Sequence, residues 1–174
     1  MNSPPQRLRP RWRARLGILA MMVITAGCAG GQEVTPEAVA QARRLWTQAN
    51  IRDYDLDWSV RGPNNAHYSV TVRDGGVRKI ESVQRDGSKV ELHPGDSQFY
   101  SVDGLFHTID DELALRKTDQ PFGQPKGTKV VMRFLPDAKL GYPYWYHRDV
   151  MGTPLSIAIE VNTLTPTAPA SKTP

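Results

Sequence analysis

The stretch Asp53–Val60, with the sequence DYDLDWSV, decides the fold because polar and apolar residues alternate along all of it. A period of two is typical of an antiparallel β-strand with one buried and one solvent-facing side. The same alternation resumes at Tyr68, Val70 and Val72, after a turn at Gly62–Asn65. The sequence therefore predicts a β-hairpin whose even-numbered apolar residues face the core.

The pairing of the two strands can also be predicted from the sequence. If Tyr68 lies opposite Val60, antiparallel pairing places Asp55 opposite Arg73 and Asp57 opposite Thr71. An aspartate opposite an arginine relieves part of the repulsion among the carboxylates of the first strand.

A helix is expected before this hairpin, because Thr35 and Pro36 match the first positions of a helix. Its apolar residues recur at helical spacing and are Ala38, Ala42, Leu45, Trp46 and Ala49, with Gln41, Arg43 and Arg44 outward. We expect this helix to pack on a sheet and not to lie on a membrane surface. The apolar face of the helix consists mainly of small residues, and the helix carries little basic charge.

A second helix is predicted from Ser101 to about Arg116. Its buried stripe comprises Val102, Leu105, Phe106, Ile109 and Leu113, and its wet side comprises Asp103, Asp110, Asp111 and Glu112. The simplest interpretation of these acids is a solvated helix face.

The remaining apolar patterns predict strands at 77–83, 89–92, 129–135 and 155–161, with a bulge or a short edge in the first of them, and a turn leading into a strand over 140–149. The order is helix, three or four strands, helix, three strands. This order predicts an α+β fold in which two helices cover one face of an antiparallel sheet.

The N-terminal region is typical of a secretory signal peptide over residues 1–27. Arginines occupy every second position from Arg7 to Arg15, and the short apolar run Leu16–Gly27 follows. The junction Ala26-Gly27-Cys28 resembles the lipobox of bacterial lipoproteins, although Thr25 stands where leucine is usual. The resemblance implies that Cys28 receives a diacylglyceryl group and becomes the mature N-terminus.

Two alternatives to lipidation are an ordinary thiol at a secretory cleavage site and a transmembrane anchor. The anchor is disfavoured because a span needs roughly 20 apolar residues. Ala29, rather than aspartate, follows the cysteine. The resemblance therefore favours the inner leaflet of the outer membrane over the inner membrane, and secretion is a further alternative.

Processing at Cys28 would change the charge of the chain. Residues 1–27 contain five arginines and no acid, which leaves 17 basic and 18 acidic side chains in the rest. This balance argues against a nucleic-acid partner. We expect a short tether at 28–34, one globular domain at 35–164 and a disordered tail at 165–174, and the lone cysteine leaves no disulfide.

The acidic residues Asp53, Asp55 and Asp57 are a candidate contact site, because they project from one face of the predicted strand. They suit a cation or a basic partner, or form a solvent-facing row balanced by Arg73. Calcium loops need a glycine turn and a distal glutamate, whereas Trp58 continues the strand. No metal or cofactor is therefore expected.

A catalytic role has one candidate, the pair His147 and Asp149, which would share a face of a strand and could orient a general base. The other histidines stand alone, and the chain contains no recognisable nucleophile motif or P-loop. The sequence therefore favours a protein that is not an enzyme.

The aromatic run Tyr142, Tyr144, Trp145 and Tyr146 is the other candidate for partner binding, because such residues are enriched in recognition surfaces. On a strand, Trp145 faces away from Tyr144 and Tyr146. Packing of all four side chains in the core is the competing interpretation.

Several short motifs resemble a known family. They are Leu45-Trp46, Ile51-x-x-Tyr54, Val70-x-Val72-x-Asp74-Gly75-x-Val77, Tyr100-Ser101-Val102-Asp103-x-Leu105-Phe106 and Leu140-Gly141-Tyr142-Pro143. Together they resemble a family of uncharacterised bacterial lipoproteins, DUF family 6174, over about residues 42–162. The resemblance implies export and a single α+β domain, and it supplies no catalytic residues.

Three functional hypotheses follow. The first is a lipid-anchored, non-enzymatic binding or assembly-accessory protein of the cell envelope, held in the membrane by acyl chains and contacting an envelope protein. The second is a small-ligand carrier or sensor with a pocket between helices and sheet. The third is a hydrolase that uses His147 and Asp149.

Overall fold

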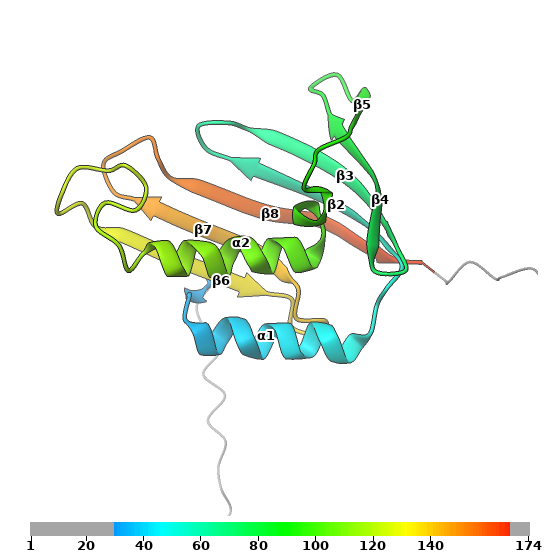
Figure 1. The fold of residues 1–174 in the computed structure, drawn as a ribbon, viewed down its shortest axis with the longest axis horizontal. Coiled ribbons are helices and arrows are strands. Elements are labelled where there is room, and N and C mark those ends of the chain that lie inside the picture. Colours follow the sequence, from blue (N-terminus) through cyan, green and yellow to red (C-terminus); the bar gives the residue numbers. More distant parts are fainter. Residues whose placement is uncertain (1–29, 168–174) are drawn as a thin grey trace, which may run out of the picture.

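The computed structural model describes residues 30–167 (Figure 1). Its elements are, in chain order, β1 (Gln32–Glu33), α1 (Pro36–Ala49), β2 (Tyr54–Arg61), β3 (Ala66–Arg73), β4 (Gly76–Val83), β5 (Lys89–Leu92), the 3-10 helix η1 (Ser97–Tyr100), α2 (Val102–Leu115), β6 (Val130–Pro136), β7 (Pro143–Val150) and β8 (Ile157–Pro166). The predicted order of two helices and two groups of strands is confirmed. The sequence did not predict β1 or η1.

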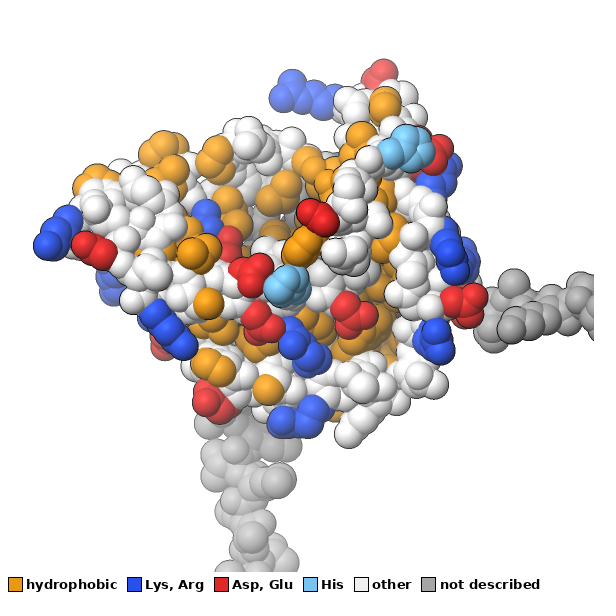
Figure 2. All heavy atoms as spheres, viewed as in Figure 1, with side chains coloured by type: hydrophobic (Ala, Val, Ile, Leu, Met, Phe, Trp, Pro, Cys, Tyr) orange, Lys and Arg blue, Asp and Glu red, His pale blue; other side chains and the backbone are white. Residues whose placement is uncertain are grey.

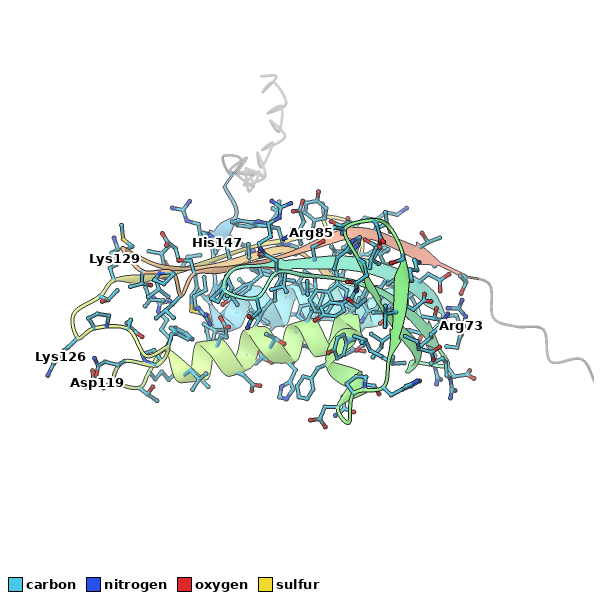
Figure 3. The ribbon with its side chains drawn as sticks, turned by 90° about the horizontal axis from the view of Figure 1, so that it is seen from above. Arg73, Arg85, Asp119, Lys126, Lys129 and His147 are labelled. Carbon is cyan, nitrogen blue, oxygen red and sulfur yellow. The ribbon has the colours of Figure 1, made fainter. Side chains whose placement is uncertain are left out.

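All strands form one 8-stranded antiparallel sheet in the order β1-β6-β7-β8-β2-β3-β4-β5. The strands that follow each helix form a consecutive group, and the two groups join where β8 pairs with β2. Helices α1 and α2 lie on the same side of the sheet (Figures 1 and 3). The predicted α+β class is confirmed, and the side opposite the two helices is called the open face below.

The core lies between the helices and the sheet. Even-numbered residues of β2 supply Tyr54, Leu56 and Trp58 to it, as the alternation predicted. The other strands and the helices contribute mainly Val70, Val72, Ile80, Met132, Phe134, Tyr146, Val161, Trp46, Leu105, Phe106 and Ile109. Alternation along each strand therefore leaves the polar side chains of β2, β3, β7 and β8 on the open face.

Helix α1 begins as predicted, because the Thr35 side chain accepts a hydrogen bond from Ala38 N at 3.2 Å. Its buried face differs by one position from the prediction. Val39 is buried with Ala42 and Trp46, whereas Leu45 is exposed. Val39, Ala42 and Trp46 are three and four residues apart, so they form the stripe that meets the core.

The predicted register of the β2–β3 hairpin was wrong by two residues. Tyr68 lies opposite Trp58 rather than Val60, and Asp55 lies opposite Thr71. This register packs the ring of Trp58 against that of Tyr68 at a tilt of 45°, with centroids 4.8 Å apart. Cross-strand aromatic packing of this kind stabilises an antiparallel pair. A bulge between β3 and β4, at Thr71/Val72, agrees with the irregularity expected there.

The boundaries of the domain also differ from those predicted. The expected tether at 28–34 contains β1, and the buried Val34 donates from its N atom to Met132 O at 3.0 Å. The expected tail at 165–174 starts two residues too early, because β8 continues to Pro166, which pairs with Tyr54. Pairing with strands that are distant in the sequence orders residues 32–33 against β6 and residues 165–166 against β2. Cys28, the signal region 1–27 and positions 168–174 lie outside the described residues.

Candidate functional site

The aspartates of the first predicted strand lie at or beside the open face, and each has a partner. Asp53 accepts from Asp74 N at 3.0 Å, and Asp55 forms a 2.9 Å ion pair with Arg73. Arg73 was the predicted partner of Asp55, although it reaches that carboxylate diagonally and not from the directly opposite position. The row is therefore a set of paired carboxylates.

Asp57 belongs to a group of four polar side chains from three strands, which we call the polar cluster: Asp57, Ser59, His67 and Asn162. His67 Nε2 lies 2.7 Å from Asp57 Oδ1. Asn162 Nδ2 donates to Asp57 Oδ1 at 2.8 Å and to Ser59 Oγ at 2.9 Å. Asp57 and His67 are partly exposed, so the cluster offers fixed hydrogen-bonding groups to a molecule on the open face.

Sequence reasoning did not find this cluster, because His67 and Asn162 stand alone in the chain. The separation of Asp57 and Asn162 is 105 residues, and only the β2–β8 pairing brings them together. Between Gly30 and Thr167, no group of three His, Cys, Asp or Glu side chains is arranged to hold a metal ion.

Tyr142 directly precedes β7, the other three aromatic residues of the run lie on it, and the four side chains do not form one surface. Tyr146 is buried in the core, and Tyr142 packs against the core while partly exposed. A register shift between Leu135 and Pro136 leaves Tyr144 as an extra residue of β7, and Tyr144 is 41% exposed. Trp145 follows on the open face, opposite in orientation to Tyr146, as the strand pattern predicted.

His147 and Asp149 also lie on β7, but each has a different neighbour. The ring of His147 packs against that of Trp145, with centroids 5.5 Å apart. Asp149 Oδ1 accepts from Ser156 Oγ at 3.0 Å, and Ser156 Oγ in turn accepts from Val150 N at 3.0 Å. These bonds tie the β7–β8 connection together. In the described chain, no hydrogen bond links His147 to Asp149 or Ser156.

The placement of Glu112 on the wet side of α2 was wrong. Its side chain is 11% exposed and accepts hydrogen bonds from Tyr146 Oη and, at 2.5 Å, from Arg148 Nη1. Arg148 also donates to Leu155 O at 3.0 Å, and its guanidinium lies 3.9 Å from the Phe122 ring centroid. Two partners on β7 satisfy this buried carboxylate, which the pattern of α2 alone could not reveal.

Burial controls the ionisation of this group. Desolvation raises the pKa of Glu112, while the Tyr146 hydroxyl and the Arg148 guanidinium act in the opposite direction. Burial and the nearby carboxylate raise the pKa of Tyr146, so Tyr146 stays protonated and donates. We assign these three residues to the attachment of α2 to the sheet.

Two hollows of the described chain are open grooves. One of about 490 Å³ runs along α1 and reaches Asp110 of α2, and another of about 890 Å³ lies at the edge formed by β1 and β6. Figure 2 shows acidic, basic and apolar side chains mixed over the helix side, with apolar side chains also visible between α2 and the strands above it. Among residues 30–167, no helix is long and apolar enough to cross a membrane.

The fold defines a small α+β protein with one antiparallel sheet, helices on one side and a polar open face on the other. A family model described as "Family of unknown function (DUF6174)" matches residues 38–120, from α1 to the loop after α2. These residues are similar to the family that the sequence motifs resemble. No curated protein and no solved structure matches the chain. The family description names no activity, ligand or location.

Proposed function

We propose that the chain is an exported, lipid-anchored protein of the cell envelope that acts as a non-enzymatic binding or assembly-accessory module. The proposed anchor is Cys28, and the favoured site is the inner leaflet of the outer membrane. The arginine-rich and apolar segments before Cys28 support export. The early start of the domain, at β1, supports a tether of only a few residues.

One observation carries the binding proposal: the helices cover only one side of the sheet, and the other side presents ordered polar groups. The polar cluster holds a carboxylate, an imidazole, a hydroxyl and an amide in hydrogen-bonding contact. Groups that are already oriented lose little freedom on binding, which favours recognition of a polar protein surface. We place the partner contact there.

Site-specific photocrosslinking in the living cell tests this contact. A photoreactive side chain at position 67 or 55 is expected to give a discrete adduct with an envelope protein. The matched control is position 48, since Gln48 is exposed on α1 on the opposite side of the molecule. Equal adducts at all three positions, or none at 67 and 55, would contradict a binding site on the open face.

A small-ligand carrier is the second candidate, and one observation favours it. Trp58 Nε1 is buried without a hydrogen-bond partner in the described chain, and the Trp58 ring packs against the rings of Tyr68 and Tyr100, which are only partly buried. Such a site would suit an apolar ligand with one acceptor atom. Titration with a fatty acid should then change Trp58 emission, and unchanged emission at saturating concentration would argue against this candidate.

A further inference from the structure

The first described residues enter β1 beside the open face of β6 and β7. A Cβ placed on Gly30 would lie 3.2 Å from Nη1 of Arg133, and one placed on Gly31 would lie 3.1 Å from Cζ3 of Trp145. Figure 3 shows the first described residues on the side of the sheet opposite α2, near the labelled His147. The chain therefore meets the domain on the open face.

Cys28 precedes Gly30 by two residues. Two residues reach at most about 7 Å, even when fully extended. Acyl chains on Cys28 would therefore begin close to Arg133 and Trp145. The position of the anchor thus determines which surface of the domain comes nearest to the bilayer.

The surface at this point combines apolar, aromatic and basic side chains. We call it the anchor-side patch and define it as Val131, Arg133, Leu135, Trp145 and His147. Leu135 lies opposite Trp145 and Arg133 lies opposite His147, so the patch contains two cross-strand pairs. Leu135 is 44% exposed, although it is a large apolar residue. Tryptophan and arginine beside exposed leucine suit the interfacial layer of a bilayer.

The charges around the patch favour an anionic surface. Of the nearby acids, Glu160 pairs with Arg61 at 3.4 Å, Asp149 accepts from Ser156, and Glu33 pairs with Arg116 at 3.3 Å. Within residues 30–167, no acid lies at ion-pairing distance from Arg133. Arg133 is therefore available for a phosphate oxygen.

The edge groove beside the patch has the same character. Its volume is about 890 Å³, and Lys129 and Arg133 line it together with the Glu33–Arg116 ion pair. Lys129 lies at the end of the sheet in Figure 3. Basic side chains next to a membrane anchor are attracted to anionic phospholipids.

We propose that the anchor-side patch lies in the phospholipid headgroup layer and is the membrane-facing surface of the domain. The inference rests on the proposed lipid anchor and specifies how the anchored domain is oriented. The open face at β6 and β7 then faces the bilayer, and α1 and α2 face away from it. The polar cluster begins on β8, the strand next to β7, and stays outside the patch.

Tryptophan fluorescence tests this orientation, because the tryptophans of the described chain differ in burial. Trp46 and Trp58 are 5% and 7% exposed, whereas Trp145 is partly exposed in the patch. The protein, isolated from membranes as the cell makes it, is reconstituted into phosphatidylethanolamine and phosphatidylglycerol vesicles with a dibrominated phosphatidylcholine. We expect the bromolipid to quench Trp145 emission and to leave Trp145→Phe unquenched.

A charge reversal tests the role of Arg133. Arg133→Glu should reduce the quenching, and the matched control Arg44→Glu, an exposed position on α1, should not. Equal losses in the two variants would overturn the assignment of Arg133 to the headgroup layer.

The state of Cys28 separates the two proposals. Mass spectrometry of the same preparation reports whether Cys28 carries acyl chains. Acylated protein without Trp145 quenching would overturn the orientation and leave the lipid anchor standing. Absence of acyl chains on Cys28 would overturn both proposals. In a separate crosslinking experiment, a protein adduct from a photoreactive residue at position 145 would overturn the membrane-facing role of the patch and assign the patch to a protein partner.

Discussion

At the scale of single residues, Glu112 shows how a helix pattern can mislead. It follows Asp110 and Asp111 in an acidic run, which is typical of a solvated helix face. The fold places Tyr146 and Arg148 of β7 beside it, and the three side chains satisfy one another. A buried carboxylate needs such partners, since desolvation of a lone charge is costly.

Removing one partner of this buried pair should destabilise the protein strongly. Arg148→Met leaves the Glu112 carboxylate without its cation, and we expect a loss of about 3–5 kcal/mol in the free energy of unfolding. The matched control is Arg61→Met, whose ion pair with Glu160 is largely exposed and should matter by less than about 1 kcal/mol. Urea denaturation of both variants measures this, and equal losses would contradict the role given to the buried pair.

Glu112 should also make stability depend on pH. Burial raises its pKa in the folded chain above its ordinary value of 4.5, so the folded state holds the proton more tightly than the unfolded state. The contribution of Glu112 to stability is therefore complete below pH 4.5 and is lost as the pH rises through the folded pKa.

Comparison of the wild-type protein with Glu112→Gln isolates this effect. The free energy of unfolding of the wild type should fall relative to that of Glu112→Gln as the pH is raised from 4.5 towards neutrality. Parallel pH profiles for the two proteins would show that Glu112 titrates alike in the folded and unfolded chains.

At the scale of elements, Tyr54 connects both helices to the sheet. Its ring meets that of Trp46 edge-on, with centroids 5.5 Å apart, and its hydroxyl accepts from Val102 N at 3.2 Å at the start of α2. Burial raises the pKa of Tyr54 to about 12. The hydroxyl therefore stays neutral while it accepts the bond from α2.

Tyr54→Phe should weaken the start of α2. The substitution leaves the buried N–H of Val102 without an acceptor, which costs about 1–3 kcal/mol. Tyr144→Phe is the control, because that side chain is exposed on β7 and should change stability by less than about 0.5 kcal/mol. Thermal unfolding followed by circular dichroism distinguishes them, and similar midpoints would refute the capping role.

A single glycine lets η1 pack against α2. A Cβ on Gly104 would overlap the backbone of Gln98 and Phe99, which cannot move aside as a side chain can. We expect Gly104→Ala to cost about 1–3 kcal/mol, as other overpacked sites do. Gly95→Ala has open space around it and serves as the control. A stable Gly104→Ala protein would show that η1 is free to shift.

The sequence predicted the features that depend on neighbours only a few residues away. These are the alternation of β2 and β3, the cap at Thr35 and the buried stripe of α2. The register of the hairpin and the burial of Glu112 depend on packing between elements. The polar cluster depends on the β2–β8 pairing, which joins the two ends of the domain. These features needed the folded structure for that reason.

At the scale of the whole molecule, one end of the sheet and its central strands have different roles in our account. The end formed by β1, β6 and β7 receives the chain from Cys28 and carries the anchor-side patch. The polar cluster on β2, β3 and β8 is proposed to receive the partner. Such a division would let the domain bind a protein while its lipid keeps it at the membrane.

The state of the N-terminus in the cell tests the central claim most directly. Mass spectrometry of the protein from the membrane fraction should find a mature chain that begins at Cys28 and carries a diacylglyceryl group, and Cys28→Ser should accumulate with residues 1–27 still attached. A mature chain that begins elsewhere, or a free thiol at Cys28, would contradict the account.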